Sequence, residues 1–322
     1  MLKIGPYQFE HNIVLAPMAG ITDAVFRDLC RTHGASYTLA EMVASKKELW
    51  QSKKSSTRHV NINDPEPRAV QLIGTDPQEL ADAAAWQVSQ GAQIIDLNMG
   101  CPAKKVCSVS AGSALMADPE KVKNIFQAVV SSVEIPVTVK IRTGTDNQNK
   151  NALEIALIAE EQGLQAITIH GRTREAKFTG NAEYDTIKQV KQQVNIPVIA
   201  NGDICTPEQA DFVLKYTSAD GIMIGRASQG YPWIFREINH YLKTGQQLKK
   251  PSSLEFKQTM FKHINGLHEL YGEMLGVRIA RKHIGWYAQH LPNGNTLRKT
   301  FNQLNSAKEQ LTLLNDYFEH GF

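Results

Sequence analysis

The residues best suited to chemistry in this 322-residue chain lie in the stretch NMGCP at positions 98–102. This stretch follows the apolar run 94–97, and its glycine and proline would end a buried β-strand. Cys101 is therefore expected at the carboxyl edge of a strand, beside a turn. A thiol with an ordinary pKa of about 8.5 keeps its proton at neutral pH and can act as a general acid. Because isolated cysteines are often buried and inert, the interpretation of Cys101 depends on its neighbours.

Short apolar runs alternate with amphipathic stretches through most of the chain, a pattern typical of βαβ units and a parallel sheet. Eight such runs cover residues 13–16, 37–39, 69–73, 94–98, 137–141, 166–170, 198–201 and 221–224. Eight alternations within roughly 230 residues predict an α/β fold of the (β/α)8 TIM-barrel type. A doubly wound sheet is the alternative, but it usually carries G-x-G-x-x-G after an early strand, and this sequence has no such motif.

Helices are expected between the runs and again after them. The barrel helices are predicted at residues 23–32, 76–90, 119–133, 152–162, 183–191 and 207–215. After the basic segment 243–251 the pattern becomes helical only, over residues 256–270, 277–290 and 306–318. We therefore expect a catalytic TIM barrel at 1–243, followed by a small all-helical C-terminal domain at 251–322.

Composition favours an ordinary globular protein, with 42% hydrophobic and 21% charged residues. The net charge of +3 is compatible with a polyanionic partner but does not itself predict one. The four cysteines show neither C-x-x-C pairs nor histidines at metal-ligand spacing, so no disulfide framework and no metal site are expected. Residues 1–10 lack the apolar core of a signal peptide, and no run reaches membrane-spanning length. A monomeric cytoplasmic protein without a membrane partner is expected.

The polar residues that follow the runs indicate a cofactor. Gly202 follows the seventh run and Gly225-Arg226 the eighth, where TIM barrels usually bind phosphate through backbone amides. Either glycine alone could serve only a tight turn, but together with Arg226 they predict a phosphorylated ligand. Lys140 and His170 fall on neighbouring strands, where a cation or donor suits the electron-rich edge of a reduced flavin. These features together favour flavin mononucleotide (FMN).

Several longer motifs lie in order along the chain, each at an expected strand end. They are APMAGITD at 16–23, VQL at 70–72, DLNMGCPAKKV at 96–106, VKIRTG at 139–144, TIHGRT at 168–173 and ANGDI at 200–204. On these motifs the chain strongly resembles the bacterial tRNA-dihydrouridine synthases, and most closely their B-type members. The resemblance covers nearly the whole length.

The resemblance implies an FMN enzyme that uses NADPH, or NADH, to reduce a tRNA uridine to 5,6-dihydrouridine. B-type members are associated with position 17 in the D-loop of tRNA. The likeness places Asn98 and Arg142 facing the uracil. It also implies that the flavin is held by Pro17, Met18, Ala19, Gln71, Lys140, His170, Asn201, Gly202, Asp203, Gly225 and Arg226.

The reaction needs one acid at the face of the base, because hydride added at C6 places charge on C5 and O4. Cys101 is the expected proton donor to C5, and Lys140 or Arg142 would stabilise the developing enolate. Cys107, six residues later, is the alternative acid. No second nucleotide-binding domain is visible in the sequence, so NADPH and tRNA are expected to use one barrel mouth in turn.

Three basic residues in the helical domain are the expected tRNA contacts. Arg278, Arg281 and Lys282 are spaced by three and four positions, which places them on one helix face, and Arg298 and Lys299 follow. The alternative interpretation is an ordinary solvated charged face. Charge alone does not decide between the two.

Two other functions fit part of the sequence. An FMN barrel resembling dihydroorotate dehydrogenase would act on a free pyrimidine, but it would need neither the helical domain nor the loop at 100–105. A tRNA-binding protein without catalysis would purify without a yellow chromophore.

Overall fold

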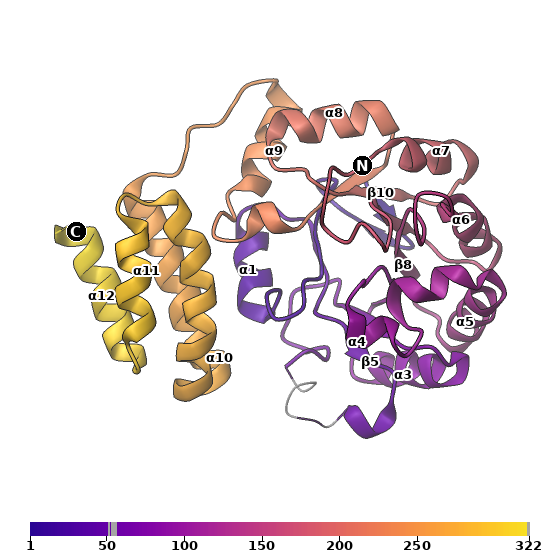
Figure 1. Ribbon diagram of the computed structural model, residues 1–322, viewed down its shortest axis with the longest axis horizontal. Coiled ribbons are helices and arrows are strands. Elements are labelled where there is room, and N and C mark those ends of the chain that lie inside the picture. Colours follow the sequence, from indigo (N-terminus) through magenta and orange to yellow (C-terminus); the bar gives the residue numbers. More distant parts are fainter. Residues whose placement is uncertain (51, 53–56, 321–322) are drawn as a thin grey trace. The chain divides into compact units, whose positions relative to one another are not determined.

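The computed structural model describes residues 1–50, 52 and 57–320 (Figure 1). The chain divides into two compact units. The barrel unit comprises Met1–Ala24 and Ala35–Gly225, and the helical unit comprises Val25–Gly34 and Arg226–Phe322.

The helical unit includes chain that precedes the predicted change at residues 243–251. Most of α1 (Ala24–Thr32) and all of α9 (Ile234–Thr244) belong to it. The reason is packing: Phe26 of α1 stacks on His263 with ring centroids 5.3 Å apart, and Trp233 lies in the helical core. A composition change along the chain cannot reveal such contacts between distant segments.

The barrel unit is built on a nine-stranded parallel sheet in the order β4-β3-β11-β10-β9-β8-β7-β6-β5. A bridge between Leu39 and Ala69 joins the end of β4 to β6, which brings the sheet round on itself. Each of the eight predicted runs holds one strand, and β5 is an additional short strand paired with β6. The expected TIM-barrel class is confirmed. The strands are β3 (Ile13–Leu15), β4 (Tyr37–Thr38), β5 (Val43–Ala44), β6 (Ala69–Ile73), β7 (Ile94–Met99), β8 (Val137–Arg142), β9 (Ile167–His170), β10 (Val198–Asn201) and β11 (Gly221–Ile224).

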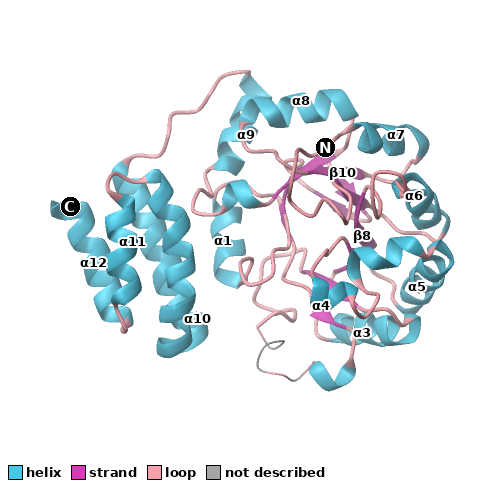
Figure 2. Cartoon of the chain, viewed as in Figure 1, coloured by secondary structure: helices cyan, strands magenta, loops and turns pink. Residues whose placement is uncertain are grey.

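Long helices lie around the outside of these strands (Figure 2). Three of them begin in the same way, with Asp76, Asp118 or Thr206 accepting a hydrogen bond from the backbone amide three residues later, and a proline in the first turn. Each such cap contributes about 1 kcal/mol to the stability of its helix. Five of the six predicted barrel helices are found in the barrel unit, as α3 (Pro77–Ser89), α5 (Pro119–Ser132), α6 (Ala152–Glu161), α7 (Asp185–Gln193) and α8 (Pro207–Thr217). The sixth, predicted at 23–32, forms as α1 but belongs mostly to the helical unit.

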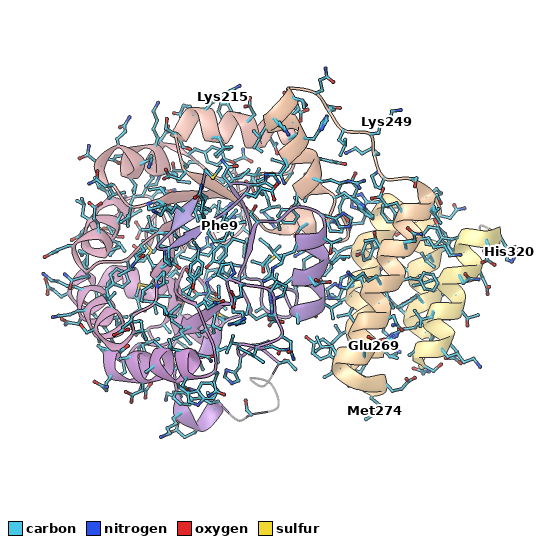
Figure 3. All side chains as sticks on the ribbon, turned by 180° about the vertical axis from the view of Figure 1, so that it is seen from behind. Phe9, Lys215, Lys249, Glu269, Met274 and His320 are labelled. Carbon is cyan, nitrogen blue, oxygen red and sulfur yellow. The ribbon has the colours of Figure 1, made fainter. Side chains whose placement is uncertain are left out.

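A hairpin of β1 (Lys3–Ile4) and β2 (Tyr7–Gln8) closes the amino-terminal end of the barrel. Phe9, labelled in Figure 3, belongs to a core cluster with Ile94 and Ala166, which stand at the beginning of their strands. This apolar cluster fills the amino-terminal end of the barrel. The polar residues of the interior therefore lie near the carboxyl ends of the strands.

The helical unit contains α10 (Ser253–Tyr287), α11 (Gly294–Gln303) and α12 (Ala307–His320). Helix α10 is interrupted at Gly272, whose φ of 73° and ψ of 170° suit glycine. The predicted helices at 256–270 and 277–290 are the two segments on either side of it. Helix α11 was not predicted, because Leu297 and Phe301 are its only buried large apolar residues. No helix in the described part of the chain is long and apolar enough to cross a membrane.

Of the three buried histidines in the described part of the helical unit, His263 and His283 lie in contact with each other. His263 and His283 lie with ring centroids 4.6 Å apart, and His263 Nδ1 is 2.9 Å from the hydroxyl of Tyr287. Burial lowers the pKa of His263 to about 3. Burial, followed by the nearby His263 and Lys282, lowers the pKa of His283 as well. Both imidazoles are therefore neutral in the folded protein.

Acid is expected to destabilise the helical unit. The unfolded chain binds protons at these histidines below a pH of about 6.5, whereas the folded chain does not, so stability falls as the pH falls through that value. Between about pH 7.5 and 5.5 the loss should be about 1 kcal/mol for each histidine. Urea unfolding of the full chain measures it. The double variant His263→Phe with His283→Phe should lose about 2 kcal/mol of this pH dependence between about pH 7.5 and 5.5. The part that comes from His33 and His290, whose pKa values are also lowered by burial, should remain. An unchanged dependence in the double variant would contradict the assignment.

Candidate active site

Polar residues alternate with apolar ones on the strands that carry the site. Asp96 on β7 is the register partner of Gln71 on β6 and of Thr138 on β8, and Asn98 is the partner of Lys140. Successive side chains on a strand point to opposite faces, so these polar groups share the barrel interior while their apolar neighbours face the helices. The interior near the carboxyl ends of the strands is therefore a hydrogen-bonded polar layer.

Cys101 stands directly beyond β7, as predicted, and its backbone is held from several sides. The amides of Gly100 and Cys101 donate to Asn98 Oδ1 over 3.2 and 3.0 Å. The Cys101 carbonyl accepts from the amide and the hydroxyl of Ser113 over 3.1 and 2.9 Å. Arg142 Nε donates to the Gly100 carbonyl over 2.7 Å. These bonds fix the direction in which the thiol leaves the strand.

The Cys101 thiol is partly buried, and burial is the largest influence on it. Burial raises the pKa of Cys101 above its ordinary value, although a hydrogen bond from the Ala103 amide acts in the opposite direction. The sulfur therefore holds its proton at neutral pH. The alternative acid, Cys107, has its own Sγ 3.6 Å from the Cys101 carbonyl, so it contributes to holding the loop.

Lys140 projects from β8 among polar partners. Its Nζ donates to Asn201 Oδ1 over 3.1 Å, and Asn201 Nδ2 donates onward to the Met223 carbonyl over 2.8 Å. Burial, and then the charge of Arg142, lowers the pKa of Lys140 to about 8, while Asp96 acts to raise it. The ammonium remains mostly charged at neutral pH.

Arg142 is almost fully buried, and its guanidinium binds backbone carbonyls of two loops. Besides the Gly100 carbonyl, it holds the carbonyls of Thr173 and Lys177 through Nη1, over 2.9 and 2.8 Å. The ring of Phe178 lies over the guanidinium, 5.4 Å away. Arg142 thus ties the loop after β7 to the loop after β9.

The loop after β10 is organised by Arg172, a residue to which the sequence analysis gave no role. Arg172 is buried and donates to both carboxylate oxygens of Asp203 over 2.9 and 2.5 Å. Asp203 also accepts from the Ala182 amide over 2.8 Å. The Asp203 carboxylate is therefore bound to the protein, and a role in flavin binding would have to come from its backbone.

The two glycines of the predicted phosphate site, Gly202 and Gly225, follow the carboxyl ends of the neighbouring strands β10 and β11. Gly202 has a φ of 126°, and a Cβ there would lie 2.7 Å from the Ala182 Cβ and 3.1 Å from the His170 ring. Glycine is required at this position, and its backbone can approach an anion closely. Arg226 follows Gly225 and is exposed.

The loop of the first motif is held by Glu41, another residue without a role in the sequence analysis. Glu41 is buried after β4, accepts from the Gly20 amide over 2.6 Å, and pairs with Arg58 over 2.7 Å. Met18 donates its amide to Thr22 Oγ1 over 2.9 Å. A lone carboxylate after the second run carries no sequence pattern that would reveal these contacts.

A cavity of about 700 Å³ opens beside the thiol loop. Its walls come from the loops after β7, β8 and β9, and its lining residues are Pro102, Cys107, Thr145, Asp146, Asn147, Gln148, Arg174, Glu175 and Lys177. The side chains of Lys104 and Lys105, which the sequence analysis used to favour a tRNA enzyme, lie outside the described part of the chain. Cys107 of the thiol loop lines this cavity, whereas Cys101 and the residues predicted to hold flavin are not among its lining residues.

The three basic residues predicted to contact tRNA differ in their surroundings on α10. Arg278 and Lys282 are exposed. Arg281 Nη2 donates to the Leu304 carbonyl over 2.9 Å and to Asn305 Oδ1 over 3.0 Å, so it joins α10 to the turn before α12. Arg278 and Lys282 thus present exposed side chains, and Lys282 Nζ also lies 5.8 Å from the centre of the Trp286 ring.

The sequence and the barrel point to one protein family. A sequence model described as "Dihydrouridine synthase (Dus)" matches residues 14–320, and the chain belongs to this family. It is 53% identical to tRNA-dihydrouridine synthase B of Pseudomonas syringae pv. tomato, over 99% of this chain and 95% of the relative. It is 54% identical to tRNA-dihydrouridine synthase B of Escherichia coli K12, over 99% of both chains. The expected B-type resemblance and the expected class of enzyme are confirmed.

A solved structure with little sequence similarity shares the fold. Histamine dehydrogenase from Rhizobium sp. 4-9 superposes with a TM-score of 0.53 at 12% identity. The match covers 82% of this chain and half of that longer chain. It supports the fold assignment only.

Asp203→Ala is expected to destabilise the barrel unit by about 3 kcal/mol, because it leaves the buried Arg172 guanidinium without its carboxylate. Asp211→Ala is the matched control. It breaks the Lys215–Asp211 pair, whose lysine is 76% exposed on α8 (Figure 3), and should cost about 0.5 kcal/mol or less. Urea unfolding compares the two variants. Equal losses would show that Arg172 does not depend on Asp203.

Proposed function

We propose that this chain is a tRNA-dihydrouridine synthase that uses FMN and NADPH to reduce a D-loop uridine, position 17 by its resemblance to B-type enzymes. The printed names of its relatives support the reaction. The observation that carries the proposal is the position of Cys101, whose backbone is held beyond β7 beside the strand that carries Lys140 and Arg142. Burial raises the pKa of the Cys101 thiol, which favours its protonated form. With tRNA as substrate, the protein acts in the cytoplasm, and we propose that it does so as a monomer.

The residues of the barrel mouth fit FMN. Gly202 and Gly225 offer backbone amides for the phosphate at adjacent strand ends, with Arg226 beside them. Lys140 and His170 offer donors for the ring, and a carbon at position 202 would collide with the His170 side chain. The remaining flavin contacts would come from two sets of residues. One is the loop of the first motif, through Pro17, Met18 and Ala19, and the other is Gln71, Asn201 and Asp203.

The chemistry assigned to this chain is proton delivery and charge stabilisation. A reduced flavin, when bound, supplies the hydride that uracil C6 receives. As the C5=C6 double bond is lost, charge develops on C5 and O4, and the cations of Lys140 and Arg142 stabilise it. The S–H bond of Cys101 then breaks, its proton forms the new C–H bond at C5, and the thiolate regains a proton from water. A raised thiol pKa favours the protonated form that this step needs.

Both substrates reach the same end of the barrel in this proposal. The cavity beside the thiol loop lies at the carboxyl ends of the strands, where NADPH would reduce the flavin before tRNA enters. The target base must leave its loop to reach this depth, at a cost that is smallest for an unpaired uridine. Asn98 and Arg142 are the proposed contacts to the uracil.

The two alternative functions are less well supported. Relatives that match over 99% of this chain carry tRNA in their names, which disfavours a free-pyrimidine enzyme. A tRNA-binding protein without catalysis would not need the protonated thiol. Flavin absorbance of the purified protein and dihydrouridine mapping of tRNA from cells lacking the gene would separate the three.

Cys101→Ala is expected to slow the reduction of unmodified tRNA by the reduced enzyme by about 100-fold or more, the usual contribution of a general acid. Flavin content and flavin reduction by NADPH should stay near wild type, because neither step uses this proton. A rapid-mixing experiment with a single turnover separates the two half-reactions. Cys107→Ala is the matched control and should retain most of the rate. An unchanged rate in Cys101→Ala would remove the thiol from the mechanism.

Arg278→Glu combined with Lys282→Glu is expected to weaken tRNA binding about tenfold at moderate salt and to reduce its salt dependence, because each exposed cation neutralises a phosphate. Arg281 is left intact because it holds the Leu304 carbonyl. Lys215→Glu on α8 is the control and should have little effect. Filter binding with tRNA measures the affinity, and flavin absorbance checks the barrel. Equal affinity in the double variant would favour an ordinary solvated face.

A further inference from the structure

A continuous chain of side-chain hydrogen bonds runs from the barrel interior to the thiol loop. Thr138 Oγ1 donates to Asp96 Oδ1 over 2.6 Å, and Gln71 Nε2 donates to Asp96 Oδ2 over 2.7 Å. Asn98 Nδ2 then donates to Gln71 Oε1 over 2.8 Å. Asn98 Oδ1 ends the chain by accepting from the amides of Gly100 and Cys101.

The direction of every bond in this chain is decided at Asp96. An ionised carboxylate can only accept hydrogen bonds, so the amide of Gln71 must turn its NH2 group toward Asp96. Its oxygen must then face Asn98, which in turn must present its own oxygen to the loop. Without an acceptor at position 96, either amide could rotate by half a turn. A rotated Asn98 would direct its NH2 group at the backbone N–H groups of Gly100 and Cys101. The hydrogen bonds from these two amides to Asn98 would then be lost.

We propose that Asp96 is a positioning residue of this enzyme, which acts through Gln71 and Asn98 to hold the backbone of Cys101. The inference rests on the proposed function, since it concerns the placement of the proposed acid. It also assigns Asn98 a second role, because both ends of its side-chain amide are bound to the protein. Asp96 itself is buried and contributes no atom to the reaction.

The groups that face Asp96 are consistent with this role. The ammonium of Lys140 on β8 and the phenol of Tyr37 on β4 are the titratable neighbours, beside the neutral Thr138 and Gln71. Burial raises the pKa of Asp96 to about 6, against the opposing effects of Thr138, Gln71 and Lys140. The carboxylate is thus ionised at neutral pH and available as the terminal acceptor.

Two substitutions at Asp96 separate orientation from charge. Asp96→Asn keeps an oxygen for Gln71, while its NH2 group can donate to the Thr138 hydroxyl. Asp96→Leu has a similar volume and offers no acceptor. Hydrogen–deuterium exchange of the peptide that contains Gly100 and Cys101 measures how firmly the loop is held. Single-turnover reduction of tRNA by the reduced holoenzyme measures the consequence for the reaction.

Asp96→Leu should speed amide exchange at positions 100 and 101 by about tenfold and slow tRNA reduction by about the same factor, the effect of one lost buried hydrogen bond. Flavin reduction by NADPH should stay within about twofold, since that half-reaction does not use Cys101. Asp96→Asn should keep all three quantities within about threefold of wild type. Unchanged exchange in Asp96→Leu, or an equal defect in Asp96→Asn, would overturn the inference.

Gln71→Glu tests the middle of the chain without a change of volume, and it applies even if Asp96→Leu fails to fold. Two carboxyl groups would then face each other across the 2.7 Å contact and share one proton. While that proton is present, the new side chain still donates to Asp96 and accepts from Asn98. As the pH rises and the proton leaves, tRNA reduction by the variant should fall while the pH is still below about 8. The wild type should not fall in that range, because Lys140 keeps its charge until its pKa of about 8 is reached. Parallel pH profiles would contradict the inference.

Failure of this inference can be told apart from failure of the proposed function. If Cys101→Ala retains full activity, the proposed acid is wrong, while faster amide exchange in Asp96→Leu would still show that Asp96 holds the loop. If Cys101→Ala is inactive and Asp96→Leu changes neither exchange nor rate, the acid is right and the positioning role is wrong.

Discussion

The site depends on how the three consecutive peptide groups between Met99 and Pro102 are held. Asn98 Oδ1 accepts hydrogen bonds from the amides of Gly100 and Cys101. Arg142 donates to the Gly100 carbonyl, and Ser113 donates to the Cys101 carbonyl. Loop backbone next to an open barrel mouth would otherwise bind water and move. Because each of these partners stands on a strand or a short helix, the rigidity of the barrel is passed to the thiol.

The same bonds explain why so many polar groups can be buried together. Gln71, Asp96 and Thr138 satisfy one another inside the barrel, and Lys140 is satisfied by Asn201. A buried polar group without a partner would cost a few kcal/mol, so each link supports its neighbours. The β1–β2 hairpin packs at the opposite, amino-terminal end of the barrel, so this polar layer lies at the carboxyl ends of the strands.

The fold was largely predictable from sequence, because each barrel strand is a short apolar run and each cap such as Asp76 or Asp118 is a local signal. The thiol loop was predictable for the same reason. Glu41, Arg172 and the role of Asp96 were not, since their partners lie on other segments. Polar alternation on β7 and β8 is the one sequence signal that could have drawn attention to Asp96. The boundary of the helical unit depends on contacts of α1 and α9 that no local pattern reveals.

The central claim is that Cys101 holds a proton at neutral pH, ready for transfer to the base. The pH dependence of its alkylation by iodoacetamide tests this most directly, with the peptides of Cys101 and Cys107 resolved by mass spectrometry. We expect a rate that still rises as the pH passes about 8.5, the ordinary pKa of a thiol, because burial raises the pKa of Cys101. A rate that reaches its plateau at or below neutral pH would show a thiolate and contradict the account.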